Sequence, residues 1–313
     1  MPPPELQQFA VTLIAAEPRR DFARFAQDCM GRLGQSGFMI ASSTVLHPEQ
    51  AFDFLVAGTS AKELRTAIAG FIAWEKIDSI VQLPTNRRKM FLLADMESTM
   101  IQQEMLEEMA DAIDARAHVT EVTRRAMNGE IDFVTALRER VALFAGQPES
   151  LLTEMARRMT PMPGARALVA TMRSHGATCW LASGGFRYFT QRVAAQLGFA
   201  LDSANELLIE NGRLTGAVAE PIQDKTTKLE IFRRGLATLG VVAAQSVVVG
   251  DGANDLDMIN ASTTGDGLGI AFHAKPSVEE RATHIINYAD LTALLYAQGY
   301  RREEFVGADQ GFC

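Results

Sequence analysis

The chain has 313 residues, 47% of them hydrophobic and 22% charged, which predicts a folded protein with room for two domains and excludes a disordered chain. Its formal net charge of −8 argues against a nucleic-acid partner, because phosphate contacts need clustered Lys and Arg. No stretch reaches the roughly 18 apolar residues of a membrane span, the amino terminus lacks an export signal, and the three cysteines match no metal or disulfide framework. We therefore expect a cytoplasmic protein without a membrane partner.

The first part of the chain alternates short strand patterns with two helical patterns. The predicted strands are residues 8–15, 36–46, 51–58 and 79–84, and the predicted helices are residues 21–33 and 60–75. This βαββαβ order over residues 1–84 is typical of a ferredoxin-like domain. It resembles an ACT-type module, which pairs with another copy as in a homodimer, or binds an amino acid. Because this fold has many uses, we favour a dimerising or structural role over effector binding.

A short basic run separates this part from the rest of the chain. Residues 85–89 form the predicted linker, and the sequence Asn86-Arg87-Arg88-Lys89 is interpreted as solvated. From residue 90 to residue 313, strand patterns alternate with long helical stretches. That alternation predicts an α/β domain with a parallel sheet and right-handed crossovers.

Three apolar runs in this second domain end in a polar residue. They are KMFLLAD, ATCWLAS and QSVVVGD, which end at Asp95, Ser183 and Asp251. Each residue alone could be an ordinary helix cap or turn. In an open α/β sheet, however, ligands bind beyond the carboxyl ends of the strands. We therefore expect these three side chains to meet in one crevice.

The residues after Ser183 suit an anion. Gly184 and Gly185 let backbone N–H groups approach a phosphate, and a helix is predicted to begin around Phe186. A lysine ahead of the Asp251 strand could add a counter-charge, and the pattern alone leaves Lys225 and Lys228 as candidates.

The residues after Asp251 suit a cation. In GDGANDLDM, Asp251 and Asp255 flank Asn254 on a glycine-bearing loop. Carboxylate oxygens with water and phosphate are the ligands that Mg²⁺ prefers. Two acids facing Asp95 and Glu97 would also repel one another without a cation.

Taken together, DMEST, LASGG, Lys228 and GDGAND resemble the four motifs of the haloacid dehalogenase superfamily of phosphohydrolases. The closer resemblance is to phosphoserine phosphatases and covers residues 89 to about 298, with a helical cap at about 104–162. The interval between Lys228 and Asp251 is that of the family, which favours Lys228 over Lys225. The resemblance implies a Rossmann-like core and hydrolysis of L-phosphoserine to L-serine and phosphate, the last step of serine biosynthesis.

The resemblance also implies a role for each motif residue. Asp95 would form an aspartyl-phosphate, and Glu97 would protonate the leaving oxygen and activate water. The implied Mg²⁺ ligands are Asp95, the backbone carbonyl of Glu97 and Asp251, with Asp255 in support. The implied phosphate-binding residues are Ser183, Gly184, Lys228 and Asn254.

The cap would select the substrate. By resemblance, Glu104 would bind the ammonium of phosphoserine and Arg140 its carboxylate, while Met127 and Phe133 would close the apolar side. Without the resemblance, Glu104 and Arg140 would be interpreted as surface residues of amphipathic helices.

Two features depart from the family. Glu97 stands where the family has Asp, and its extra methylene would carry the proton donor about 1 Å too far unless the site has adjusted. The run near 261–267 carries a few residues more than the family pattern.

Two other functions fit the same motifs. A phosphatase or phosphotransferase for another small phosphomonoester would prefer a substrate without the amino or carboxyl group. A weakly active sensor would bind an amino acid or phosphoserine with almost no turnover.

Overall fold

The computed structural model describes residues 7–57 and 60–307, and the side chains of Met127 and Lys225 lie outside that description. The first domain consists of β1 (Gln8–Ala15), α1 (Phe22–Gln35), β2 (Met39–His47), β3 (Ala51–Ala57), α2 (Ala61–Ile72) and β4 (Ile77–Gln82). Its strands pair antiparallel in the order β2-β3-β1-β4. The predicted βαββαβ order is confirmed.

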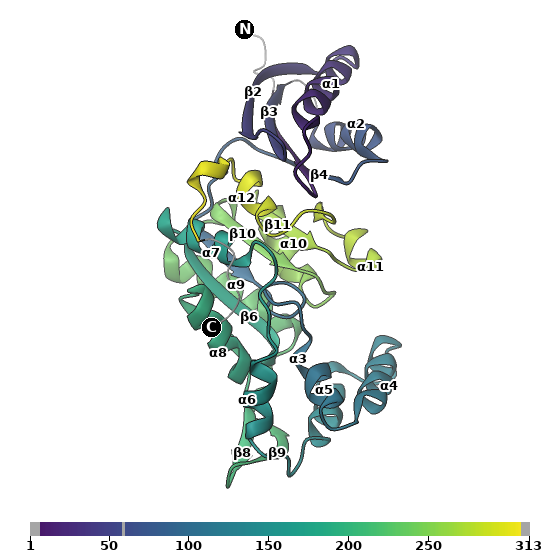
Figure 1. The fold of residues 1–313 in the computed structure, drawn as a ribbon, viewed down its shortest axis with the longest axis vertical. Helices are drawn as coiled ribbons and strands as arrows, with labels where there is room; N and C mark the ends of the chain where they lie inside the picture. Colours follow the sequence, from purple (N-terminus) through teal and green to yellow (C-terminus); the bar gives the residue numbers. More distant parts are fainter. Residues whose placement is uncertain (1–6, 58–59, 308–313) are drawn as a thin grey trace.

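Strand β1 is buried on both faces. Val11 and Leu13 pack with Phe22 of α1 and Leu64 of α2, whereas Ile14 points to the other face and belongs to the core of the second domain. An almost continuous apolar strand is what two covered faces require. The first domain is therefore packed against the second and does not stand apart from it (Figure 1).

The second domain has a six-stranded parallel sheet in the order β12-β11-β10-β5-β6-β7. Its strands are β5 (Phe91–Ala94), β6 (Thr178–Phe186), β7 (Leu201–Asn205), β10 (Ser246–Gly250), β11 (Leu268–Phe272) and β12 (His284–Ile286). Its helices are α7 (Ala165–Ser174), α8 (Arg187–Leu197), α9 (Lys225–Leu239), α10 (Leu256–Thr264), α11 (Pro276–Glu279) and α12 (Ala293–Ala297), with short 3₁₀ turns η1 (Ala243–Gln245) and η2 (Arg302–Glu304). The three predicted apolar runs are the adjacent strands β10, β5 and β6.

Helices cover both faces of this sheet. Leu92 and Ala94 of β5 share a core with residues of α7, α8 and α12. Phe91 and Leu93 point to the opposite face, where they pack with residues of α9 and α10. Among the described residues, no helix is both long and apolar enough to cross a membrane.

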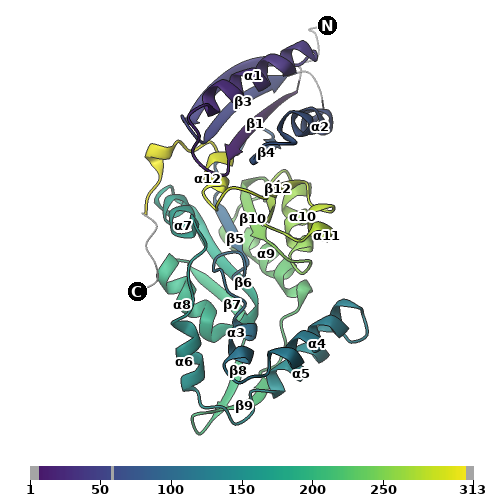
Figure 2. The same ribbon diagram turned by 45° about the vertical axis from the view of Figure 1, so that its right-hand side comes forward.

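Between β5 and β6 the chain leaves the sheet. It forms α3 (Met105–Asp111), α4 (Arg116–Met127), α5 (Phe133–Ala142) and α6 (Ser150–Ala156). A hairpin of β8 (Leu207–Glu210) and β9 (Arg213–Val218), which our sequence analysis did not predict, joins them: Gly146 N donates to Leu214 O at 2.8 Å. This helical region and the hairpin lie at the far end of the molecule from the first domain (Figures 1 and 2).

The run between the two domains is solvated only in part: Asn86 and Arg88 are exposed as predicted, whereas Arg87 and Lys89 are not. Arg87 donates to both carboxylate oxygens of Asp53 at 2.7 and 2.8 Å and to Ala297 O at 3.0 Å. Lys89 is 2% exposed, and its Nζ donates to Ala244 O at 2.7 Å. Both cationic side chains are therefore hydrogen-bonded within the protein, because a buried charge needs a close partner.

Strand β4 adds a second tie across the junction. The buried carboxylate of Asp78 accepts three consecutive backbone N–H groups, from Asn287 at 2.8 Å, Tyr288 at 3.1 Å and Ala289 at 2.8 Å. His284 of β12 contacts Val81 O through Nε2 at 3.1 Å. Hydrogen bonds to side chains and backbone therefore hold the two domains at the β4–β12 edge.

Candidate active site

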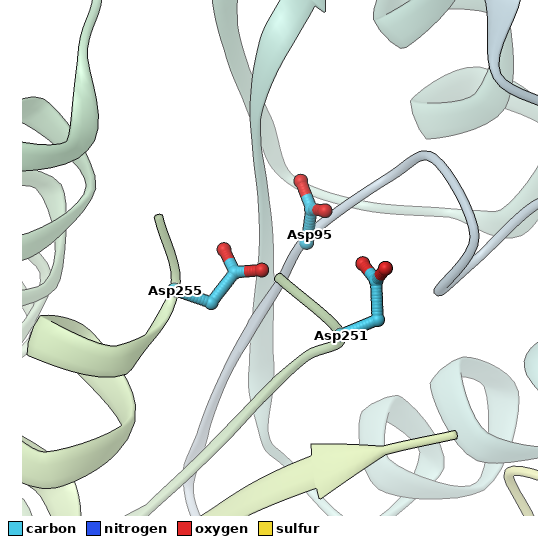
Figure 3. Close-up of side chains that lie close together, drawn as sticks. All are labelled: Asp95, Asp251 and Asp255. Carbon is cyan, nitrogen blue, oxygen red and sulfur yellow. The ribbon is translucent and has the colours of Figure 1, made fainter. Parts of the chain in front are cut away.

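Three carboxylates meet at the carboxyl ends of β5 and β10. Asp95 directly follows β5, Asp251 directly follows β10, and Asp255 precedes the first residue of α10. One oxygen from each lies within 4.8 Å of the others, and the three side chains lie close together (Figure 3). Because β5 and β10 are parallel neighbours, their polar ends are brought to one edge, as the strand pattern predicted.

A buried lysine binds two of these carboxylates. Lys228 lies in the first turn of α9, which begins after the capping residue Asp224. Its Nζ donates to Asp95 Oδ1 and to Asp255 Oδ1, both at 2.6 Å. Burial lowers the pKa of Lys228, but the charges of Asp255 and Asp95 outweigh burial and raise the pKa overall. Lys228 is therefore charged, whereas the side chain of its competitor Lys225 lies outside the described structure.

The three carboxylates carry more negative charge than Lys228 offsets. Burial raises the pKa of Asp95 well above its usual value, although Lys228 opposes this. Burial, followed by the charge of Asp255, raises the pKa of Asp251 to about 6. These upward shifts mean that burial disfavours the ionised forms of Asp95 and Asp251 in the protein alone. A divalent cation with oxygen ligands fits this donor set.

The loop after Ala182 is a bulge in β6. Ala182 pairs with Ser203, and pairing with β7 resumes only at Phe186 and Asn205. Residues 183–185 thus project from the sheet edge, and the helix expected near Phe186 begins at Arg187 because the strand continues through Phe186. Ser183 is buried, and its Oγ accepts the Gly185 N–H at 2.9 Å.

The carboxylate of Glu97 has a defined seat. Its Oε1 accepts the backbone N–H of Met105, at the start of α3, at 2.9 Å. A Cβ on Gly185 would lie 2.8 Å from Glu97 Oε2, so this glycine gives the side chain its space. Burial, followed by the charge of Glu104, raises the pKa of Glu97 to about 8. Glu97 thus has the form of a protonated acid at neutral pH.

The helical region supplies the other predicted residues. Phe133 lies over the loop, with its Cζ 3.7 Å from where a Cβ on Gly184 would be. Glu104 accepts the Ser98 hydroxyl at 2.7 Å, and the half-buried Arg140 donates through Nε to Ala136 O at 3.1 Å.

Arg140 and Glu104 face one site without pairing. Within residues 7–57 and 60–307, no carboxylate lies within ion-pair distance of Arg140, yet its charge lowers the pKa of Glu97. Burial of part of the side chain raises the pKa of Glu104, although the residue keeps solvent contact, and the Ser98 hydrogen bond opposes that rise. The predicted role of Met127 falls on a side chain outside the described residues.

Comparison with known proteins agrees with this geometry. Residues 92–260 match the model of the haloacid dehalogenase-like hydrolases. A phosphoserine phosphatase from Albidiferax ferrireducens is 42% identical over 207 residues, and the match covers 64% of this chain and 86% of that protein. The chain belongs to the phosphoserine phosphatase family of these hydrolases.

Other relatives of this chain include longer proteins. The Streptomyces coelicolor phosphoserine phosphatase is 41% identical over 265 residues, or 84% of this chain and 64% of that protein. The chain spans between 54% and 64% of the length of the first curated relatives.

Solved structures of the family share its architecture. The unliganded probable phosphoserine phosphatase from Vibrio cholerae has a TM-score of 0.73 at 30% identity, covering 93% of this chain and 86% of that one. A phospho-aspartyl intermediate analogue of phosphoserine phosphatase has a TM-score of 0.60 at 33% identity, covering 66% of this chain and 97% of that one.

Sequence reasoning missed several residues that shape the candidate site. Thr99 Oγ1 donates to Asp251 Oδ1 at 3.4 Å. A Cβ on Gly250 would lie 2.4 Å from Asp255 Cγ, and one on Gly252 would lie 2.3 Å from Asn254 Oδ1. The glycines of GDGAND therefore make room for the acid and the amide, a requirement that the spacing of two glycines around Asp251 could have suggested.

Proposed function

We propose that this hydrolase converts L-phosphoserine to L-serine and phosphate through an aspartyl-phosphate, as the last step of serine biosynthesis. The observation that carries the proposal is the buried Asp95, which directly follows β5, binds Lys228 and lies among the carboxylates of Asp251 and Asp255. A carboxylate held this way is suited to attack a phosphoryl group. The phospho-aspartyl analogue solved for a family member supports the same chemistry.

In the first half-reaction an oxygen of Asp95 attacks phosphorus, and the bond from phosphorus to the serine oxygen breaks. Protonated Glu97 gives its proton to that oxygen, so serine leaves with a neutral hydroxyl group instead of an alkoxide. Lys228 has three N–H donors and uses two on Asp95 and Asp255, which leaves one for a phosphoryl oxygen. Ser183, the Gly184 amide and Asn254 complete the proposed phosphate site.

In the second half-reaction the roles reverse. Glu97, now ionised, takes a proton from water as the water oxygen attacks phosphorus. The bond from phosphorus to Asp95 breaks, and inorganic phosphate and the original carboxylate result. Phe133 lies over the loop at Gly184, where it would limit the access of other water.

Mg²⁺ is the cation that we propose for the acidic cluster. Asp95, Asp251 and the backbone carbonyl of Glu97 would hold it, with Asp255 in support, and hard oxygen donors of this kind suit the ion. When bound, Mg²⁺ neutralises phosphoryl charge and reduces its repulsion with Asp95.

Phosphate release from L-phosphoserine, measured with Mg²⁺ and again after chelation, tests the proposed function. We expect Mg²⁺-dependent turnover that is higher than with phosphomonoesters lacking the amino or carboxyl group. Faster release from such an analogue would overturn the substrate assignment, and tight phosphoserine binding without turnover would overturn the activity.

The metal site makes a prediction for stability. The pKa of Asp251 rises from 3.8 to about 6 on folding, so the folded protein binds this proton more tightly than the unfolded chain. Without metal, the free energy of unfolding therefore falls as pH rises from about 4 to about 6. At pH 7.5, Asp251→Asn should raise the melting temperature of the metal-free protein.

The same variant should lose stabilisation by Mg²⁺. At 100 times its dissociation constant, the ion adds about 2.7 kcal/mol to the free energy of unfolding of the parent, which raises the melting temperature of a chain of this length by roughly 4 °C. Thermal denaturation with and without Mg²⁺ measures both effects. An Mg²⁺-induced shift that is unchanged in Asp251→Asn would contradict the site.

Substrate choice predicts a second result. Arg140→Ala should lower kcat/KM for L-phosphoserine by roughly 10–100-fold, because the charge-assisted pair between Arg140 and the carboxylate of the substrate is lost. O-phosphoethanolamine, which has no carboxylate, should be almost unaffected. Arg138→Ala is the matched control, because Arg138 lies on the same helix but is exposed and pairs with Glu220. An equal loss for both substrates would make Arg140 a structural residue.

A further inference from the structure

One side chain of β7 forms a hydrogen bond to the bulge at residues 183–185. Asn205 is the last residue of β7 and is 2% exposed. Its backbone pairs with Phe186, where pairing with β6 resumes after the bulge, and its Nδ2 donates to Gly184 O at 2.9 Å. Asn205 itself has no role in the catalytic chemistry proposed above.

This hydrogen bond fixes the direction of a complete peptide group. Gly184 C=O and Gly185 N–H belong to one trans peptide unit and point in opposite directions. With the carbonyl held by Asn205, the N–H points to Ser183 Oγ at 2.9 Å. An oxygen that already accepts this N–H keeps its own hydrogen for another acceptor. The Ser183 hydroxyl is thereby arranged as a donor toward a phosphoryl oxygen.

The same amide also reaches the helix that carries the lysine. Asn205 Oδ1 accepts the Gln223 N–H at 2.7 Å. Gln223 immediately precedes Asp224, whose carboxylate accepts Thr226 N at 2.8 Å and caps α9. Lys228 follows in the first turn of that helix. One planar amide therefore links the loop at residues 184–185 to the start of α9.

We propose that Asn205 is a positioning residue for phosphoryl binding, which orients the 184–185 peptide and Ser183 and ties this loop to the start of α9. The inference rests on the proposed function, since it assigns the phosphoryl group to this loop. It concerns the phosphoryl end of the substrate alone. Its loss should therefore affect every phosphomonoester equally, unlike the loss of Arg140.

Asn205→Asp gives the sharpest test because the two side chains have the same shape. The carboxylate still accepts the Gln223 N–H but offers Gly184 O an acceptor in place of a donor. Asn205→Ala is the second variant if Asn205→Asp does not fold. Asn205 borders a hollow of about 260 Å³, so water can enter and replace part of the lost bond in the alanine variant. The alanine effect should be in the same direction and smaller.

The control is Ser203→Ala on the same strand. Ser203 Oγ donates to Gln223 Oε1 at 3.0 Å, so this variant removes a neighbouring hydrogen bond without touching the loop. Each protein is titrated calorimetrically with inorganic phosphate in the presence of Mg²⁺. Melting temperature and kcat/KM for L-phosphoserine and O-phosphoethanolamine are measured on the same samples.

Asn205→Asp should weaken phosphate binding by about tenfold or more and lower kcat/KM by about 10²-fold, by the same factor for both substrates. Ser203→Ala should stay close to the parent in both measurements. Phosphate affinity in Asn205→Asp equal to that of the parent overturns the inference, as does an equal loss in Ser203→Ala. If the parent binds phosphate but hydrolyses neither substrate, the proposed function fails, while the calorimetric comparison still decides the role of Asn205.

Discussion

Asp95→Asn should lower the turnover of phosphoserine by more than about 10³-fold, because an amide cannot form the acyl-phosphate and the reaction loses its covalent path. The fold should survive the change. The Asn side-chain oxygen can still accept from Lys228, which in the parent donates to Asp95 Oδ1 at 2.6 Å. One of three crowded carboxylates is also removed, so the metal-free variant should melt at or above the temperature of the parent.

Radiolabelled phosphoserine checks the covalent step directly. The parent, quenched in acid during turnover, should retain labelled phosphate on the protein, and Asp95→Asn should retain none. Asp257→Asn is the control, because Asp257 lies nearby at the start of α10 but is exposed. Turnover of Asp95→Asn above a few per cent of the parent would exclude the covalent mechanism.

Glu97→Gln should lower turnover by roughly 10²–10⁴-fold, the loss expected when general acid–base catalysis is removed. The Gln oxygen can still accept the Met105 N–H, which Glu97 Oε1 accepts at 2.9 Å in the parent. The hydrogen bond that positions this side chain at the start of α3 is therefore kept, and binding of Mg²⁺ and phosphoserine should persist. The comparison isolates the transferable proton from the position of the side chain.

The role of Glu97 also predicts the direction in which kcat/KM changes with pH. Burial and Glu104 raise the pKa of Glu97 to about 8, so the proton donor is present below that pH and is lost above it. In the parent, kcat/KM should fall as pH rises through about 8, and this descent should be absent in Glu97→Gln. Glu97→Asp retains a carboxylate of the family length and should stay within about tenfold of the parent. A Gln variant as fast as the parent would remove Glu97 from catalysis.

The position of Glu97 shows where sequence reasoning stopped. The extra methylene of Glu97 predicts that its carboxyl group lies too far along for the leaving oxygen. In the structure, the Met105 N–H and the open space at Gly185 hold this carboxyl group in a defined position. Burial and the charge of Glu104 raise the pKa of Glu97, and both depend on how the chain folds around this side chain. These partners come from the next helix and the next strand, which no local pattern places beside Glu97.

The strand ends, in contrast, could be predicted. An apolar run that ends in a polar residue specifies both a buried parallel strand and its carboxyl edge, so Asp95 and Asp251 were correctly brought together. The β8–β9 hairpin was missed although Asn211-Gly212 is a strong turn signal between apolar runs. Arg87 was misjudged because its partners Asp53 and Ala297 lie far away in the sequence.

The shared packing of the two domains has a consequence for synthesis on the ribosome. The first sheet has all its strands once Gln82 has been made, and its strand pairs are local enough to form early. Yet Ile14 and Ile80 belong to the same core as Tyr296, near the other end of the chain. A nascent chain must therefore carry an uncovered apolar sheet face until α12 emerges. That interval is when we expect the chain to be most prone to aggregation and most dependent on chaperones.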